Sequence, residues 1–294
     1  MTRPLQHITV LGMGQMGRLV ALRLKHAGHT VHVWNRTLAT AQTLAASGIV
    51  VHAVAADAVR GADIVISELA DGPAVAAVLF EQDAASAMSK GTLFIDMASI
   101  QPSEAREHAA RLSAMGIACL DAPVSGGTVG AQAGTLAIMV GGPEAVFDRA
   151  QGVLAVLGRA TRVGLHGAGQ LAKLANQMIV GATIGVVAEA LLFAAKGGAD
   201  MAQVRAAIAG GFADSRILQL HGQRMVERDF AQHGSMQVQL KDMRNVMTTA
   251  AEIEFDAPLA AMVHKLYSQA MDHGLGQLDH SALFVELARR NGME

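Results

Sequence analysis

Short apolar runs alternate with helical patterns over about the first 160 residues of the chain. The runs are apolar or β-branched almost throughout, which is typical of strands buried on both faces of a parallel sheet. Repeated alternation of this kind predicts a doubly wound α/β sheet. We expect strands at residues 7–11, 30–34, 49–54, 64–69, 93–97, 118–124, 137–140 and 160–163, and helices at 15–27, 38–47, 103–115 and after Pro143.

The strand pattern ends near Leu165, where the glycines of residues 164–169 interrupt it. Helical patterns then follow one another to the C-terminus, at residues 170–196, 201–209, 215–227, 240–253, 258–273 and 281–290. A chain of 294 residues is long for one hydrophobic core, so two domains are expected. We place an α/β dinucleotide-binding domain at residues 1–164 and an all-helical domain at residues 165–294.

One apolar segment, residues 178–195, is long enough to cross a membrane. It contains Glu189, and Lys173 and Lys196 flank it. A buried helix is apolar all round for the same reason as a membrane span, and no second span occurs elsewhere. We therefore predict a buried helix and no membrane partner.

Composition narrows the class of protein further. Hydrophobic residues make up 51% of the chain and charged residues 16%, which favours a folded chain over a disordered one. The net charge is −2 without a basic block, which argues against a nucleic-acid partner. The single cysteine fits a reducing compartment, and the first residues lack a secretory pattern, so a cytoplasmic location is expected.

A glycine-rich turn follows the first expected strand and opens the first expected helix. This position is the one that a dinucleotide-binding turn requires, because its glycines allow a tight bend and a close approach to a pyrophosphate. The candidate cofactor-binding residues of the turn are Gly12, Met13, Gly14, Gln15, Met16 and Gly17.

The end of the second strand favours NADP(H) over NAD(H). NAD sites usually place an acidic residue there, but this chain has none before Asp57. Asn35, Arg36 and Thr37 stand there instead, and Arg36 can pair with a 2′-phosphate. The alternative is that Arg36 is only a solvated residue at a helix start. Ligands lie beyond the carboxyl ends of the strands in such sheets, which adds Leu69, Ala70 and Ser99 as cofactor candidates.

Two further segments could carry the reaction. Ser125, Gly126 and Gly127 follow the sixth strand, and their backbone N–H groups could cradle a small carboxylate. Lys173 lies in the first turns of the apolar helix, with Asn176 and Gln177 on the same helical face. Burial would lower the pKa of this lysine towards a value useful for acid–base catalysis.

Segments 12–17, 121–127, 167–173 and 240–242 together resemble the β-hydroxyacid dehydrogenase family, which includes 3-hydroxyisobutyrate dehydrogenase and tartronate semialdehyde reductase. The resemblance covers essentially the whole chain. It implies a Rossmann domain joined by a long central helix to an all-helical domain for substrate binding and oligomerisation, assembled as a homodimer or homotetramer.

The resemblance also implies roles for individual residues. Ser125, Gly126 and Gly127 would bind the substrate carboxylate, Lys173 would be the general acid and base, and Lys241 would contact the cofactor or substrate. Many members carry Asn four residues after the lysine, where this chain has Gln177, with Asn176 one place earlier. Either amide is therefore a candidate for contact with substrate.

The resulting hypothesis is an NADP(H)-dependent oxidoreductase that interconverts a short 3-hydroxy or 2-hydroxy-3-oxo acid and its semialdehyde. Tartronate semialdehyde reductase activity is favoured, with 3-hydroxyisobutyrate dehydrogenase and glyoxylate or succinic semialdehyde reductase as alternatives. An imine reductase shares the fold, but such enzymes generally lack the lysine. A non-catalytic NADP-binding scaffold is the alternative of another class, and Lys173 argues against it.

Other polar residues are interpreted structurally. No metal site is expected, because His26, His29 and His32 cross from a helix end into a strand and would not converge on an ion. Cys119 lies within a strand pattern, which indicates a buried, inert thiol. Structural hydrogen bonding is favoured over catalysis for Asp96 and Asp121.

Overall fold

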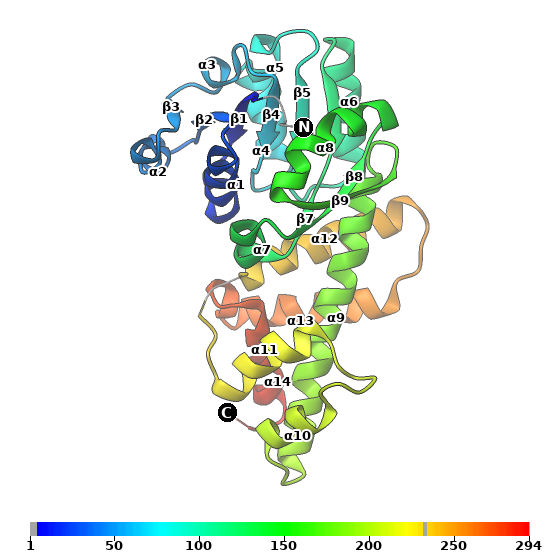
Figure 1. Ribbon diagram of the computed structural model, residues 1–294. Coiled ribbons are helices and arrows are strands. Elements are labelled where there is room, and N and C mark those ends of the chain that lie inside the picture. The colour runs from blue at the N-terminus through cyan, green and yellow to red at the C-terminus, as the bar shows by residue number, and fades with distance from the viewer. Residues whose placement is uncertain (1–4, 232–233, 294) are drawn as a thin grey trace. The chain divides into compact units, whose positions relative to one another are not determined.

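The computed structural model describes residues 5–231 and 234–293 (Figure 1). The chain divides into two compact units, Met1–Lys173 and Leu174–Glu294. The first contains a mostly parallel sheet with helices and the second is all-helical, which confirms the expected fold class. The division lies within the long helix α9 (Ala168–Lys196), nine residues beyond the boundary expected from the glycines of residues 164–169.

The first unit is built on a sheet with strand order β3-β2-β1-β4-β5-β6-β8-β7, and β9 pairs with β8. The strands from β3 to β6 in this order are parallel, whereas β8 runs antiparallel to β6 and β7 and parallel to β9. The strands are β1 (His7–Leu11), β2 (Thr30–Trp34), β3 (Val50–His52), β4 (Ile64–Ser67), β5 (Leu93–Asp96), β6 (Ala118–Asp121), β7 (Val124–Ser125), β8 (Leu136–Gly141) and β9 (Gly158–Gly164).

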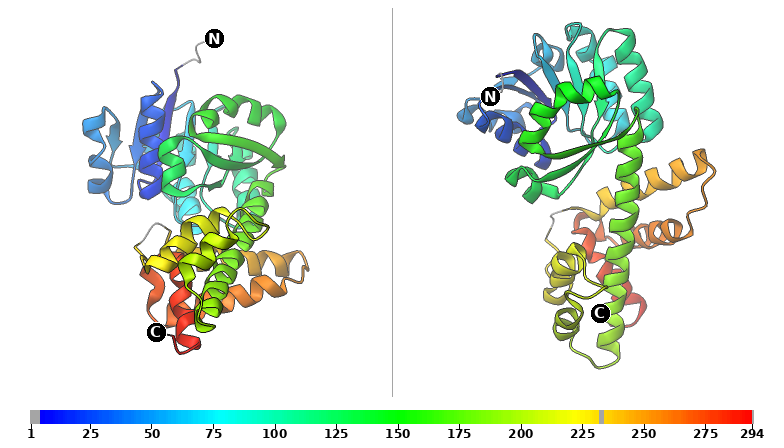
Figure 2. Two further views of the ribbon diagram at one scale, coloured as in Figure 1. Left: turned by 60° about the horizontal axis from the view of Figure 1, so that its bottom comes forward. Right: turned by 45° about the vertical axis from the view of Figure 1, so that its right-hand side comes forward.

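Helices cover both faces of this sheet, as the two views of Figure 2 also show. The longer ones, α1 (Gln15–His26), α6 (Pro102–Ala114) and α8 (Glu144–Leu157), lie close to their expected positions. The shorter helical elements are α2 (Leu38–Gln42), η1 (Ala45–Ser47), α3 (Ala55–Val59), α4 (Gly72–Ala76), η2 (Ala77–Glu81), α5 (Ala84–Ala87) and α7 (Gly127–Ala133). Those between residues 55 and 90, and α7, were not predicted, because segments of four to seven residues carry too little periodicity.

The core of the first unit follows from the alternation of side chains along each strand. In β5, Leu93 and Ile95 pack in a cluster with residues of α1 and α8, whereas Phe94 packs in a second cluster with residues of α3 and α6. These three side chains are at most 1% exposed. Both faces of the sheet are therefore buried, which explains the near-continuous apolar strands of the sequence.

The second unit is a bundle around one apolar cluster in which Tyr267 and Phe284 are fully buried. Its core also takes residues of the C-terminal part of α9, such as Ile184 and Leu191. The other elements are α10 (Met201–Ile208), α11 (Arg216–Glu227), α12 (Met236–Glu252), α13 (Pro258–Asp272), η3 (Leu275–Gln277), η4 (His280–Ala282) and α14 (Leu283–Arg290).

Of the helices that the structure describes, α9 alone has the length and the apolar composition that a membrane span requires. The prediction that it is buried all round is only partly right, since 39% of its most apolar window is buried within the chain. Ile179, Val186 and Phe193 recur at seven-residue spacing and are 67%, 65% and 81% exposed. One face of the helix packs in the core of the second unit, and this stripe does not.

Cys119 lies on β6 and is buried. Burial, reinforced by the charges of Asp96 and Asp121, raises the pKa of its thiol well above the usual value. The thiolate, which is the nucleophilic form, is therefore disfavoured.

Candidate functional site

The expected cofactor residues collect at one edge of the sheet because parallel strands end at the same edge. Gly12 follows β1, Asn35 follows β2, Leu69 lies two residues after β4 and Ser99 lies three residues after β5. The strand order β2-β1-β4-β5 places these four turns side by side along that edge. This edge, at the carboxyl ends of the strands, is where ligands bind in doubly wound sheets.

The turn between β1 and α1 has room for a Cβ atom at only one of its three glycines. Gly12 has a φ of +100°, and a Cβ there would lie 2.4 Å from the carbonyl oxygen of Glu68. A Cβ at Gly17 would lie 1.9 Å from the carbonyl oxygen of Gly12. A Cβ at Gly14 would meet no atom within 4 Å. Gly12 and Gly17 therefore let strand and helix pack closely, whereas Gly14 leaves open space above the backbone, as a bound pyrophosphate requires.

The end of β2 braces this turn. The side-chain oxygen of Asn35 accepts a hydrogen bond from the amide of Met13 at 2.9 Å, and its nitrogen donates to the carbonyl oxygen of Thr37 at 3.0 Å. Arg36 is exposed and forms no ion pair with a described residue. Arg36 directly follows Asn35, which is bonded to the glycine turn, and its exposed guanidinium suits the phosphates of a dinucleotide.

A hydrogen bond joins the segment after β6 to the start of α9. Lys173 is 8% exposed, and its ammonium donates to the carbonyl oxygen of Val124 at 2.8 Å. Ser125, Gly126 and Gly127 follow Val124 directly. Gly126 and Gly127 have φ values of +134° and +59°, so this turn needs residues without a side chain. The structure thus places the ammonium of Lys173 at the residue that precedes the Ser125–Gly127 turn.

Two buried carboxylates lie beneath these turns, in register on neighbouring strands. Asp96 accepts hydrogen bonds from the Ser67 hydroxyl at 2.6 Å and the Ala98 amide at 3.1 Å, and burial raises its pKa to about 7. Asp121 accepts from the amides of Gly167 and Gln170 at 2.8 and 3.0 Å. Burial raises the pKa of Asp121 as well, although these amides favour its ionised form. Both carboxyls make the structural hydrogen bonds that the sequence favoured.

Sequence reasoning missed the role of Asp121 at the start of α9, and it missed Gln170 entirely. Gln170 is fully buried, and its side chain bonds the backbone on both sides of Ser99. The available signal was the position of Gln170 one helical turn before Lys173, on the same face.

In the second unit the remaining candidate residues are connected by hydrogen bonds and an ion pair. The side-chain nitrogen of Gln177 donates to Asp242 at 2.7 Å, and that of Asn176 donates to the side-chain oxygen of Gln177 at 2.8 Å. Lys241 lies 3.2 Å from Asp242 in an ion pair, and Gln239 joins the network by accepting from Gln177 at 3.2 Å. Asp242 is 2% exposed, and these contacts compensate its charge inside the protein. Asp242 lies in segment 240–242, which contributed to the resemblance, but its bonds were not predicted; Gln239 carried no sequence signal.

A separate cluster in the second unit contains three side chains that could ligate a metal, His221, Asp279 and His280. Their ligand atoms lie within 4.8 Å of one another, but the guanidinium of Arg224 lies 3.1 Å from Asp279. Ser281 also donates to Asp279 through both its amide and its hydroxyl. Burial opposes ionisation of Asp279, yet the bonds from His221 and Ser281 outweigh it and hold its pKa well below the usual value. The cluster therefore suits a structural ion pair between Arg224 and Asp279 better than it suits a bound metal cation.

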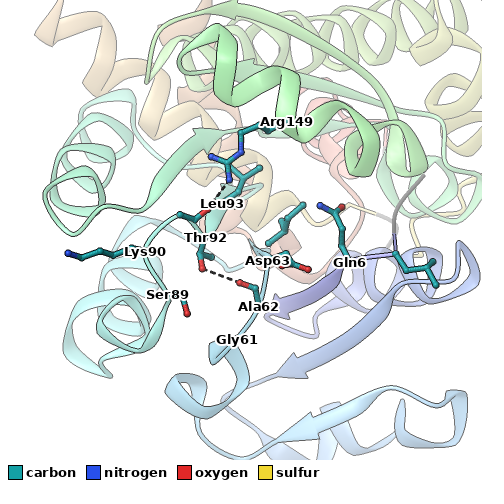
Figure 3. Close-up of a pocket in the computed structure, with 12 residues that line it drawn as sticks. Gln6, Gly61, Ala62, Asp63, Ser89, Lys90, Thr92, Leu93 and Arg149 are labelled. Carbon is teal, nitrogen blue, oxygen red and sulfur yellow. Dashed lines mark hydrogen bonds between the residues drawn. The ribbon is translucent and has the colours of Figure 1, made fainter. Parts of the chain in front are cut away.

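A cavity of about 640 Å³ lies in the first unit, at the opposite edge of the sheet (Figure 3). Its lining includes Asp63 and Thr92, which directly precede β4 and β5, and Arg149 of α8. The Thr92 hydroxyl donates to the carbonyl oxygen of Ala62 at 3.1 Å. None of the predicted site residues lines this cavity, so it is separate from the cofactor edge.

Comparison with known families agrees with this geometry. Residues 7–167 match the model of the NAD-binding domain of 6-phosphogluconate dehydrogenase, and residues 167–287 match that of NADP-dependent 3-hydroxyisobutyrate dehydrogenase. The 2-hydroxy-3-oxopropionate reductase of Escherichia coli K12 is 42% identical over 94% of this chain and 95% of its own. The chain belongs to the β-hydroxyacid dehydrogenase family.

Other relatives in this family agree. The 3-hydroxyisobutyrate dehydrogenase of Pseudomonas aeruginosa is 35% identical over 94% of this chain and 95% of its own. A solved structure of 3-hydroxyisobutyrate dehydrogenase from Mycobacterium tuberculosis is 33% identical with a TM-score of 0.89, covering 97% of this chain and 99% of the other. Family membership confirms the resemblance seen in the sequence. It makes the chain an NAD(P)-binding oxidoreductase of the hydroxyacid dehydrogenase class, which acts on CH–OH groups.

The geometry of the glycine turn predicts opposite effects at Gly14 and Gly17. Gly14→Ala should leave the melting temperature of the protein without cofactor within about 2 °C, because the added Cβ meets nothing. The same variant should weaken binding of the nicotinamide dinucleotide at least about tenfold, since the methyl occupies the space that a pyrophosphate requires. Gly17→Ala should lower the melting temperature by several degrees even without cofactor, because backbone must move. Thermal melts and fluorescence titration check this, and equal melting temperatures for the two variants would contradict it.

Proposed function

We propose that this chain uses NADPH to reduce a short semialdehyde acid to the corresponding hydroxy acid, with tartronate semialdehyde (2-hydroxy-3-oxopropionate) as its substrate. The observation that carries the proposal is the buried ammonium of Lys173 bonded to Val124, directly beside the turn at Ser125, Gly126 and Gly127. A proton donor next to a carboxylate cradle is what reduction of a carboxylate-bearing aldehyde requires.

NADP(H) is the proposed cofactor. It would be held by the Gly12–Gly17 turn, by Arg36 and Thr37 at the 2′-phosphate, and by the backbone around Leu69, Ala70 and Ser99, with Lys241 as a further contact. When bound, it supplies the hydride for the aldehyde carbon. The exposed Arg36 and the absence of any acidic residue before Asp57 support NADP(H) over NAD(H).

The residues of the chain have separate roles in the proposed reaction. Ser125 and the amides of Gly126 and Gly127 bind the substrate carboxylate and so orient its carbonyl group. As the carbonyl oxygen gains negative charge, the Lys173 ammonium stabilises it and transfers a proton to it, which leaves a neutral amine and an alcohol. The reverse reaction uses the neutral amine as the base.

The choice of tartronate semialdehyde rests on the relatives. The Escherichia coli 2-hydroxy-3-oxopropionate reductase is 42% identical, whereas the Pseudomonas aeruginosa 3-hydroxyisobutyrate dehydrogenase is 35% identical. Of the two candidate amides, Gln177 is buried and bonded to Asp242, and Asn176 is partly exposed. We therefore assign substrate contact to Asn176 and its support to Gln177.

We further propose that the protein is soluble and cytoplasmic and forms homodimers or homotetramers. In this view residues 1–164 form the NADP(H)-binding domain, and residues 165–294 form a domain for substrate binding and oligomerisation. Ile179, Val186 and Phe193 support this view, because a stripe of exposed apolar residues on one helix favours burial against a second copy of the chain.

The function is tested by the rate of NADPH oxidation with four carbonyl acids: tartronate, methylmalonate and succinic semialdehydes, and glyoxylate. We expect the highest kcat/KM with tartronate semialdehyde. Lys173→Ala should lower kcat by about 10²- to 10⁴-fold with little change in KM, because it removes proton transfer but not carboxylate binding. Lys90→Ala, at an exposed lysine beside the separate cavity, is the matched control and should keep wild-type kcat.

Two outcomes of that experiment would count against the proposal. A kcat of Lys173→Ala within a few-fold of wild type would remove the assigned role of the lysine. Faster reduction of a cyclic imine than of any of the four acids would instead indicate an imine reductase.

Cofactor preference is tested at Arg36. Arg36→Ala should lower kcat/KM for NADPH by about 10- to 100-fold, which corresponds to one or two lost charge-assisted hydrogen bonds. It should leave kcat/KM for NADH within about threefold, because NADH has no 2′-phosphate. Arg60→Ala, at an exposed arginine paired with Asp57, is the control and should alter neither value. Equal losses with both cofactors would show that Arg36 does not read the 2′-phosphate.

Self-association is tested at the exposed stripe of α9. Val186→Glu should shift the mass measured by sedimentation equilibrium towards the monomer, since a charge buried without a partner disfavours an apolar interface. Gln203→Glu, at an exposed position of α10, serves as the control and should keep the wild-type mass. A wild-type chain that sediments as a monomer would exclude the proposed assembly.

A further inference from the structure

Gln170 is a fully buried polar residue to which neither the sequence nor the proposed mechanism gives a role. Its side-chain oxygen accepts a hydrogen bond from the amide of Ile100 at 3.1 Å, and its side-chain nitrogen donates to the carbonyl oxygen of Ala98 at 2.8 Å. One amide group thus bonds the backbone immediately before and immediately after Ser99. The position of Ser99, a predicted cofactor contact, is therefore tied to the first turn of α9.

The backbone of Gln170 is fixed from a different direction. Its amide donates to one carboxylate oxygen of Asp121 at 3.0 Å, and the amide of Gly167 donates to the other at 2.8 Å. A Cβ at Gly169 would lie 2.5 Å from the carbonyl oxygen of Met139, so the helix start lies directly against the sheet. The first turn of α9 therefore has little freedom to shift or rotate.

Lys173 lies three residues further along the same helix, on the face that Gln170 shares. Its ammonium is bonded to the carbonyl oxygen of Val124. A single helical turn consequently carries two side chains that bond to different segments, the loop around Ser99 through Gln170 and strand β7 through Lys173.

We propose that Gln170 is a positioning residue that sets the distance between the Ser99 loop, where the cofactor binds, and the ammonium of Lys173. The inference rests on the proposed function, because it assumes that Lys173 protonates a substrate reduced at that loop. A planar amide that donates and accepts at once fixes both the separation and the orientation of two elements. Reactions that depend on the alignment of two bound groups lose about a hundredfold for an error near 1 Å.

A merely structural role for Gln170 is the competing explanation, and two variants separate the roles. Gln170→Leu removes both side-chain bonds at similar volume. Thr92→Val is the matched control, since it removes a buried bond to the carbonyl oxygen of Ala62 at the other end of β5. Both should lower the melting temperature by roughly 2–8 °C. Only Gln170→Leu should lower kcat, by about 10- to 100-fold, while Thr92→Val stays within about threefold of wild type.

Gln170→Glu provides the conservative rescue. A protonated carboxyl group can accept from Ile100 and donate to Ala98 as the amide does, whereas the ionised group can only accept. At acidic pH, kcat of this variant should therefore approach the wild-type value at the same pH. As pH rises and the carboxyl ionises, kcat should fall towards that of Gln170→Leu. A constant ratio of variant to wild-type kcat across pH would overturn the inference.

The double variant Gln170→Leu/Lys173→Ala tests whether Gln170 acts through the lysine. If it does, kcat of the double variant should lie within about threefold of that of Lys173→Ala alone, because the positioned group is already missing. Losses that multiply across the two positions would overturn the inference, since Gln170 would then act independently of Lys173.

Chemical labelling of Lys173 with an amine-selective reagent, followed by peptide mass spectrometry, gives a measure that does not depend on turnover. We expect Gln170→Leu to raise its labelling rate at least about threefold and Thr92→Val to leave it unchanged, because only the first loosens the turn that carries the lysine. A wild-type enzyme inactive on every semialdehyde would refute the proposed function, and the labelling rates would still decide the position of Lys173. Equal rates in Gln170→Leu and wild type would overturn the inference in either case.

Discussion

The hydrogen bonds accepted by the Asp121 carboxylate are the interaction on which the position of the start of α9 depends. Asp121 stands at the end of β6 and accepts hydrogen bonds from the amides of Gly167 and Gln170 at the start of α9. A helix start leaves several backbone N–H groups without partners, and here a neighbouring strand supplies the acceptor instead of a local capping residue. The helix that carries Lys173 is thereby anchored to the sheet that carries the cofactor turn.

A second constraint is close packing at the glycine turn between β1 and α1. It fixes the part of the expected cofactor site that follows β1. Gly17 lies against the carbonyl oxygen of Gly12 with no space for a methyl group, and Asn35 holds the amide of Met13 between them. The open backbone at Gly14 is the consequence of this tight packing on either side. The expected phosphate site is thus formed by main chain whose position the core of the first unit determines.

Much of the fold could be predicted from the sequence because its strands are buried on both faces and its main helices are long. The strands at 7–11 and 30–34 match β1 and β2, but the run at 118–124 is divided where the chain passes Pro123, which cannot donate a ladder hydrogen bond. Helix α12 begins at Met236 rather than Leu240, because Ser235 caps it with a hydroxyl bonded to the amide of Val238. Local periodicity does not reveal such boundaries.

The candidate site could likewise be predicted only in part. Lys173 and the Ser125–Gly127 turn could be found from residue type and spacing, and the structure brings them together through the carbonyl group of Val124. The bonds of Gln170 to Ala98 and Ile100 join segments about 70 residues apart, and the bond of Gln177 to Asp242 joins segments 65 residues apart. Pairings at that distance depend on tertiary packing, for which one sequence alone carries no periodic signal.

The single cysteine of the chain has a practical consequence. Cys119 is buried on β6, and its thiol is held in the protonated form. Maleimides and other thiol reagents react with an exposed thiolate. The native chain should therefore react very slowly with them. One cysteine introduced on the surface of either unit would carry a fluorophore or spin label at a unique position, without prior removal of the natural thiol.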